Sequence, residues 1–415
     1  MKKDLRLLIF TMLFLLFASN SGKAQNNADI LVIGTIHNNH AVSNYTYNDV
    51  LSILDTYKPD LICVEIRPSD FRNATPPLHE MMLATLYGDL KGIKVEPIDW
   101  WDDKNNDRNI RDSLGKIDHY IQLLSKEDSL VNNDRDIQMF IKKYGGNIYN
   151  NTKLDLLFWN GIDYSNFIWH NYKISLDVFG DSPFNLHYII RNRNMLHLIN
   201  DAIAVHKSQR IIILTGGEHK RFFDDSLSVQ KNVRLLSIEN ILPLNNYDNT
   251  KLLTNELPSL YYQKNVSEDE KEGFYSFASL PLVHGMGMDF NPSKITENSI
   301  KEYKFILDNW KRDIPNSGRL NYEFGWYNFL TGNYDTAVLF FNHYIEATES
   351  GRISLYTPLT KGIALSIIAK CYDLEGNRAM AIDYYNKSVH QLQIDKQDRL
   401  IDYIVTPYLK EPYKK

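Results

Sequence analysis

The stretch Ile30–His37 reads I-L-V-I-G-T-I-H, and it decides the fold that the sequence predicts. Four consecutive apolar residues, Ile30–Ile33, are typical of a buried strand, and Gly34 is expected to let the backbone turn. His37 would then stand at the carboxyl end of the strand. In an open α/β sheet this edge is where ligands bind.

A second copy of this arrangement lies far downstream. The apolar run Ile211–Leu214 leads into T-G-G-E-H, Thr215–His219, so both segments are a strand followed by G-x-x-H. With 20 Gly and 12 His in 415 residues, chance supplies about 0.6 such matches. The shared context carries more weight than the motif, because both imidazoles should emerge at one edge of the sheet.

The segments between these copies alternate between strand and helix patterns. A helix is expected at Tyr47–Tyr57, a strand at Leu61–Val64 followed by Glu65, and a strand at Ile93–Ile98 followed by Asp99. A further helix is expected near 78–86. This order predicts an α/β fold, with a mainly parallel sheet, right-handed crossovers and helices on both faces.

The predicted first domain spans residues 25–243, and it departs from this alternation in one place. Residues 102–173 are rich in Asn, Asp and Lys with helical apolar spacing, which predicts a helical insertion over the upper edge of the sheet. A helix follows at 186–206 and a last strand at 233–238. Residues 244–293 show little regular pattern, and we interpret them as a connector.

Residues 294–415 predict a second, all-α domain. Glycine, alanine and aromatic residues recur at spacings that resemble the 34-residue tetratricopeptide repeat, whose helix pairs pack closely through small residues. Gly332 and Gly376 are 44 residues apart, as are Ala337 and Ala381. This offset predicts two units separated by a ten-residue insertion, with further helices capping both ends.

The N-terminus predicts export. Basic residues precede an apolar run at 7–18, and the small residues Gly22 and Ala24 follow, which is typical of a secretory signal peptide at 1–24; an uncleaved anchor is the alternative. The run is shorter than the roughly 20 residues needed to span a bilayer. We therefore expect a periplasmic or secreted protein, or one peripheral to an outer membrane, with no transmembrane span in the mature chain.

The charge of the chain bears on its binding partners, and its cysteine content bears on disulfide bonds. Loss of residues 1–24 would remove four basic residues and one acidic residue, which changes the formal net charge from −5 to −8. No basic patch stands out, so nucleic acid is not an expected partner. Cys63 and Cys371 fall in different predicted domains and are expected to be buried free thiols.

His37, His219, Glu65 and Asp99 are all predicted at one rim of the sheet. Imidazole and carboxylate are the ligands of Zn, Mn, Fe or Co in catalytic sites with open positions. Each residue also has a structural alternative. The histidines could bind backbone groups, Glu65 could pair with Arg67 or Arg191, and Asp99 could cap a helix. Arg191 could lie on a solvated helix face.

The pattern resembles the Tiki/TraB superfamily, which includes Tiki-type proteases, TraB/PrgY proteins, erythromycin esterases and ChaN-like haem-binding proteins. The resemblance covers about residues 28–240. The matching elements are Gly34-Thr35-Ile36-His37, Val64-Glu65, Asp99, Arg191-Asn192 with Met195, and Gly216-Gly217-Glu218-His219. Asn192 stands where many relatives have Asp.

The resemblance implies a hydrolytic site, or a degenerate one, formed by His37, Glu65, Arg191 and His219. We expect His37, Glu65 and His219 to bind a divalent metal (Mn, Co or Zn), or one histidine to act as a general base without a metal. Arg191 would hold a substrate carboxylate or an oxyanion. The residues expected to contact substrate are Asp99, Asn192 and Glu218.

The function expected from these features is an exported hydrolase of the Tiki/TraB type. It would cleave a peptide, amide or ester bond, and the helical domain would bind substrate or a protein partner. The alternatives are a non-catalytic protein for a ligand such as haem on the same scaffold, or a scaffold protein whose repeats are the working part.

Overall fold

A computed structural model describes residues 28–41, 43–74, 78–101, 113–146, 148, 151, 153–180, 182, 185–247, 261–262, 267–283, 295, 297–349 and 361–414. The predicted signal peptide at 1–24 lies outside these residues. Cys63 and Cys371 are both buried free thiols, as expected.

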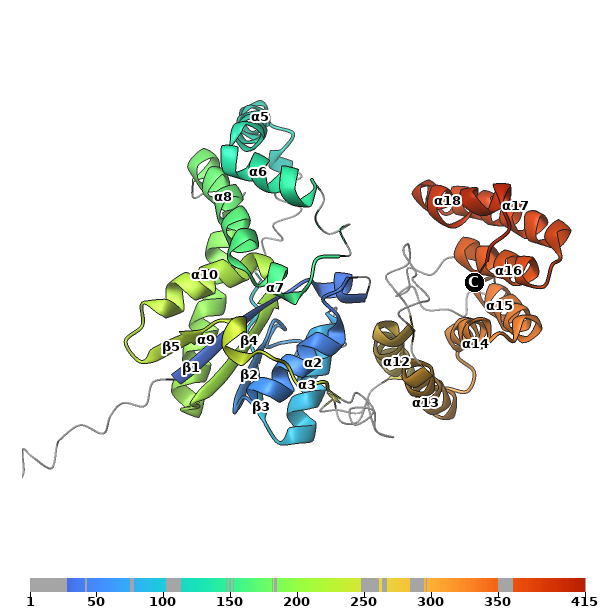
Figure 1. The fold of residues 1–415 in the computed structure, drawn as a ribbon, viewed down its shortest axis with the longest axis horizontal. Helices are drawn as coiled ribbons and strands as arrows, with labels where there is room; N and C mark the ends of the chain where they lie inside the picture. Colours follow the sequence, from blue (N-terminus) through green and yellow to red (C-terminus); the bar gives the residue numbers. More distant parts are fainter. Residues whose placement is uncertain are drawn as a thin grey trace, which may run out of the picture.

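The described chain contains a five-stranded, all-parallel sheet in the order β3-β2-β4-β1-β5 (Figure 1). Its strands are β1 (Ala28–Thr35), β2 (Leu61–Val64), β3 (Lys94–Pro97), β4 (Arg210–Gly216) and β5 (Val233–Leu236). The two strands with the G-x-x-H pattern, β1 and β4, are neighbours, and Thr35 pairs with Gly216 at their ends. The predicted α/β fold is therefore confirmed.

Helices cover both faces of the sheet because successive strand residues point to opposite sides. Leu31, Ile33 and Leu214 face α2 (Tyr47–Tyr57) and α3 (His79–Lys91). The alternate residues, Ile30 and Ile213 among them, face α9 (Asn192–His206) and α10 (Gly217–Ser228). The uninterrupted apolar runs in β1 and β4 thus reflect burial on two sides.

Gly34 does not turn the chain, which corrects the sequence interpretation. It lies inside β1 and pairs with Thr215. A Cβ at Gly34 would lie 3.0 Å from the Cα of Gly217, so glycine allows β1 to approach the start of α10. The left-handed residue is instead His37, with φ of 50°.

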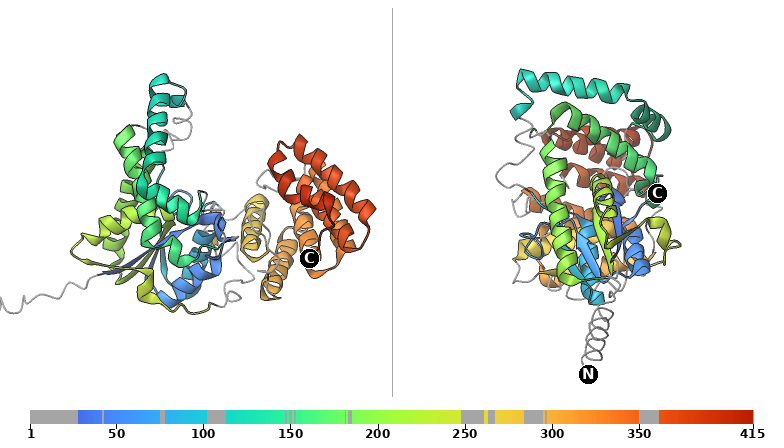
Figure 2. Two further views of the ribbon diagram at one scale, coloured as in Figure 1. Left: turned by 45° about the horizontal axis from the view of Figure 1, so that its top comes forward. Right: turned by 90° about the vertical axis from the view of Figure 1, so that its left-hand side faces the viewer.

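The insertion is helical, as predicted, in its described part. It consists of α5 (Asp118–Asn133), α6 (Arg135–Tyr144), α7 (Leu156–Trp159) and α8 (Ile162–Phe179), and it stands beyond the sheet (Figures 1 and 2). Trp159 and Tyr164 are buried where it meets the α/β core. The predicted helix at 186–206 begins as the π-helical segment η4 (Leu186–Arg191) and continues as α9.

The C-terminal part of the described chain is all helical, as predicted. Its elements are α13 (Glu297–Asp313), α14 (Gly318–Thr331), α15 (Tyr334–Glu349), α16 (Lys361–Leu374), α17 (Arg378–Ile394), α18 (Asp398–Ile404) and α19 (Thr406–Lys410). Gly332 and Gly376 follow α14 and α16 with φ of 83° and 78°, and Ala337 and Ala381 are fully buried in the next helices. The 44-residue offset thus marks equivalent positions in two helix pairs.

The connector expected at 244–293 contains a helix, α12 (Glu268–Val283), which corrects the irregular interpretation. The charge run Glu268–Glu270 forms its first turn, where acidic side chains interact favourably with the helix dipole. Helix α12 packs against α13 and also contacts α3 and the 3₁₀ helix η1 (His37–Ala41). It therefore lies between the helical region and the α/β domain (Figure 1).

Candidate functional site

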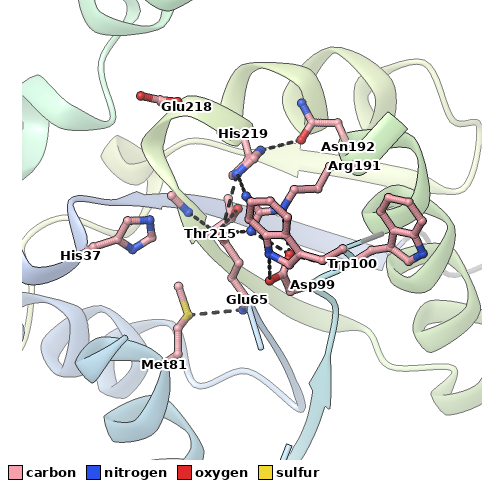
Figure 3. A network of polar contacts seen from close by, with 12 residues as sticks. His37, Glu65, Met81, Asp99, Trp100, Arg191, Asn192, Thr215, Glu218 and His219 are labelled. Carbon is pink, nitrogen blue, oxygen red and sulfur yellow. Dashed lines mark hydrogen bonds and ion pairs between the residues drawn. The ribbon is translucent and has the colours of Figure 1, made fainter. Parts of the chain in front are cut away.

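The carboxyl edge of the sheet brings the predicted polar residues together. His37 follows β1, Glu65 follows β2, Asp99 follows β3, and His219 lies in the first turn of α10 after β4. Arg191 reaches this edge from the end of η4. Figure 3 shows the resulting network of polar contacts.

Arg191 is the centre of the network. Its Nε donates to Asp99 Oδ1 at 2.9 Å, and its Nη2 donates to Glu65 Oε1 at 2.8 Å. Its Nη1 lies 3.3 Å from His219 Nε2, and its Cζ lies 4.4 Å from the centroid of the Trp101 ring. Arg191 is buried, so it does not lie on a solvated helix face. Asp99, Glu65 and His219 thus bind the guanidinium that was expected to hold a substrate anion.

Glu65 is a fixed, ionised carboxylate. Its Oε1 binds Arg191, and its Oε2 accepts from Thr215 Oγ1 at 2.9 Å and from the Gly216 N–H at 2.6 Å. Burial acts to raise the pKa of Glu65, but electrostatic interactions with His219, His37 and Arg191, together with the hydrogen bond from the Gly216 N–H, outweigh it and lower the pKa to about 2. Of the two ion-pair partners considered for Glu65, the structure shows Arg191.

Asp99 shares Arg191 with Glu65. Its Oδ1 also accepts from the Trp100 N–H at 2.7 Å, and its Oδ2 accepts from Trp101 Nε1 at 3.1 Å. Burial and the charge of Glu65 raise the pKa of Asp99 to about 6, although Arg191 opposes this. Asp99 is buried within the network; of the residues that it was considered to cap, Trp100 and Trp101 are not helical, and 102–112 lie outside the described chain.

His219 is held in one orientation by two neighbours. Its Nδ1 lies 2.6 Å from Asn192 Oδ1, which can only accept, so this nitrogen carries the ring proton. Its Nε2 then accepts from Arg191 Nη1. Both His219 and Asn192 are buried, and together they support Arg191.

Glu218 does not join the network, although it precedes His219. Its Oε2 accepts from Tyr172 Oη of α8 at 2.8 Å, and its side chain is directed away from Arg191 (Figure 3). Glu218 thus links α10 to the helical insertion.

His37 differs from the other members in its access to solvent. Its side chain is 35% exposed, against 3% for Glu65, 8% for Arg191 and 4% for His219. A Cβ built on Gly216 would lie 2.7 Å from His37 Nε2 and 3.6 Å from Glu65 Oε2, so both atoms flank one backbone position. Of these four groups, His37 is the one that can meet a substrate.

The backbone at His37 is held by a neighbouring histidine. A non-glycine residue in the left-handed region is strained and persists only where its surroundings fix it. His40 Nε2 accepts from the Ile36 N–H at 3.2 Å, and its Nδ1 donates to the Tyr45 carbonyl at 2.8 Å. Burial lowers the pKa of His40 to about 4, which keeps it neutral for this role.

Glu80 is the site residue that sequence reasoning missed. It lies in the first turn of α3 and is fully buried, and its Oε1 lies 2.8 Å from His37 Nδ1 and 2.9 Å from Thr35 Oγ1. A glutamate at the start of a helix is usually explained by its favourable interaction with the helix dipole, so Glu80 did not stand out. The available signal was its place on the buried face of α3, in register with Ala84 and Tyr87.

The expected metal site at His37, Glu65 and His219 does not fit the geometry. Their ligand atoms do not all lie within 4.8 Å of one another, and the Arg191 cation contacts both Glu65 and His219. In the described residues the group that could hold a metal is Asp134, Asp136 and His170 of the insertion. His170 Nδ1 lies 3.8 Å from Asp134 and Nε2 lies 3.5 Å from Asp136.

The pair of His37 and Glu80 predicts a pH-dependent stability. Burial acts to lower the pKa of His37, but the hydrogen bond and charge of Glu80, with the charge of Glu65, raise it to about 9 from 6.5. A raised pKa in the folded state stabilises the fold fully below pH 6.5, and this contribution is lost as the pH rises through 9.

We expect the stability difference between the wild type and His37→Asn to shrink from pH 6 to pH 9.5 in urea unfolding. Asparagine tolerates the left-handed backbone, so the variant isolates the imidazole. A difference that stays constant over this range would contradict the assigned pKa.

Comparison with protein-family models, curated proteins and solved structures found no match. Within the described residues, none of the helices combines the length and the apolar character that crossing a membrane requires.

Proposed function

We propose that the chain is an exported hydrolase of the Tiki/TraB type, which cleaves a peptide, amide or ester bond at the carboxyl edge of its sheet. The observation that carries the proposal is His37, a partly exposed imidazole between two buried carboxylates, Glu80 at Nδ1 and Glu65 on the side of Nε2. An imidazole paired with a carboxylate is a common proton-transfer device in hydrolases. Export rests on the signal-peptide pattern at 1–24.

His37 acts as the proton-transfer group in this proposal. In hydrolysis the oxygen of water bonds to the acyl carbon, the bond to the leaving nitrogen or oxygen breaks, and the leaving atom takes a proton. With its pKa near 9, His37 is protonated at neutral pH, so it supplies that proton from Nε2 and regains one from the attacking water. The ionised Glu65 stabilises the imidazolium.

Arg191, His219 and Asn192 act through Glu65. The guanidinium and the Thr215–Gly216 donors hold the Glu65 carboxylate in place, and Asn192 fixes the His219 ring against Arg191. The electrostatic environment of His37 is therefore set before a substrate arrives, which is the condition for effective charge stabilisation.

The proposed reaction needs no metal at the sheet edge. The Mn, Co or Zn expected at His37, Glu65 and His219 is therefore not part of the proposal; in the described residues, Asp134, Asp136 and His170 form a carboxylate and imidazole set that suits these ions. No step of the proposed reaction depends on that group.

The helical region would bind substrate or a protein partner. Helix α12, which packs against α13 of this region, also contacts η1, whose first residue is His37, so α12 joins the helical region to the segment that carries the proposed reactive group. A peptide or small molecule at His37 would therefore lie near α12.

The experiment is a hydrolysis screen of the purified mature chain with peptide, amide and ester substrates, with and without EDTA. We expect turnover of at least one class, unchanged by EDTA. Loss of turnover with EDTA and its return with Mn²⁺, Co²⁺ or Zn²⁺ would contradict the metal-free site. Absence of turnover together with a Soret band on haem titration would support the ligand-binding alternative.

A further inference from the structure

Glu80 is a charged side chain beside the apolar core, with the buried His40 and His79 among its electrostatic neighbours. It has no exposed surface, and Met81 and Met82, which follow it in α3, belong to the main hydrophobic core. Its Oε2 has no hydrogen-bond partner in the described part of the chain. Burial of a carboxylate with an unsatisfied oxygen is costly, so the side chain needs a compensating role.

The bonded oxygen of Glu80 shows what that role is. Oε1 accepts from Thr35 Oγ1, the last residue of β1, and faces His37 Nδ1 two residues later. Thr35 therefore fixes the carboxylate relative to the strand, and the carboxylate fixes the imidazole. Since the Nδ1 proton points at Glu80, the other nitrogen of His37 faces Gly216 and Glu65.

We propose that Glu80 is the positioning residue of His37. Its carboxylate accepts a hydrogen bond from the Nδ1–H of His37, and so directs Nε2 toward the carboxyl edge of the sheet. The catalytic meaning of this assignment rests on the proposed hydrolase function. The structural part, the place of the ring proton, stands without it.

Two variants of Glu80 separate the carboxylate from the space it fills. Glu80→Met keeps a long unbranched side chain in the core but removes the acceptor, and Glu80→Gln keeps an acceptor oxygen without the charge. Neither variant places a charge in the core, so both are expected to fold. Glu346→Gln, on the exposed face of α15, is the matched control.

The experiment is ¹⁵N NMR of the mature chain labelled with [¹⁵N]histidine, with the His37 ring assigned from its loss in His37→Asn. The readout is the nitrogen that keeps its proton when the ring is neutral. We expect Nδ1 in the wild type, Glu80→Gln and Glu346→Gln, and Nε2, which an isolated imidazole prefers, in Glu80→Met. A wild-type proton on Nε2, or the same tautomer in the wild type and Glu80→Met, would overturn the proposal.

On any substrate found by the screen, Glu80→Met is expected to lower kcat by at least about 10-fold with little change in KM, because the carboxylate orients the imidazole and does not touch substrate. Recovery of most of the rate in Glu80→Gln supports positioning; equal kcat in all three proteins would overturn it. If the tautomers follow the expectation but nothing is hydrolysed, the positioning assignment stands and the proposed function fails.

Discussion

Replacing Arg191 by methionine is expected to lower the free energy of unfolding by about 3–5 kcal/mol, the usual cost of removing one partner from a buried ion pair. Glu65 and Asp99 would both lose the buried guanidinium that they share, and His219 Nε2 would lose its donor. Methionine fills much of the vacated volume. The decrease in the free energy of unfolding therefore reflects the lost charge and hydrogen bonds more than a cavity.

The matched control for this variant is Arg193→Met. Arg193 lies two residues after Arg191, in α9, and is exposed, so the same substitution there should change the stability by no more than about 0.5 kcal/mol. Urea unfolding of both variants at pH 7 measures the difference. Adding Asp99→Asn to Arg191→Met should recover part of the loss, because one unpaired carboxylate is removed. Equal stabilities for the two single variants would contradict the central place of Arg191.

The meeting of distant residues at one edge could be predicted because strand patterns are local and parallel sheets place strand ends together. Apolar runs located β1, β2 and β4, and the residues after them, His37 and Glu65 among them, do converge. The register of Thr35 with Gly216 places the two G-x-x-H segments side by side, as their shared pattern indicated.

The roles within the cluster could not be predicted, because they depend on burial and on which atom faces which. Arg191 lies on a helix with other basic residues, and its pattern alone does not show that two acids enclose its guanidinium. His219 resembles a ligand in sequence, yet Asn192 and Arg191 occupy its two nitrogens. The contribution of Glu80 depends on how α3 packs under His37.

Backbone conformation was a second feature that the sequence predicted only in part. Glycine is the usual residue for a turn, so Gly34 was expected to supply one. The left-handed position falls at His37 instead, held by His40 four residues from Ile36. In the helical region small residues at a fixed offset did identify equivalent positions, since Gly332 and Gly376 both follow helix ends. Helix α12 was not predicted, because its sequence shows no such repeated spacing.

His37→Asn is expected to lower kcat/KM by about 10²–10⁴-fold on any substrate that the hydrolysis screen finds, the range for loss of a general acid–base group. Asparagine accepts the left-handed backbone at this position, so the fold should be retained, but it cannot transfer a proton near neutral pH. The effect should fall mainly on kcat, because His37 is assigned to proton transfer and not to substrate affinity.

The most direct test of the account compares kcat/KM of the wild type, His37→Asn and His197→Asn on the best substrate of the screen. His197 lies on α9 with its side chain 76% exposed, which controls for the substitution itself. The account predicts that His197→Asn matches the wild type while His37→Asn loses at least about 10²-fold with its fold intact. Wild-type activity in a folded His37→Asn protein would contradict it.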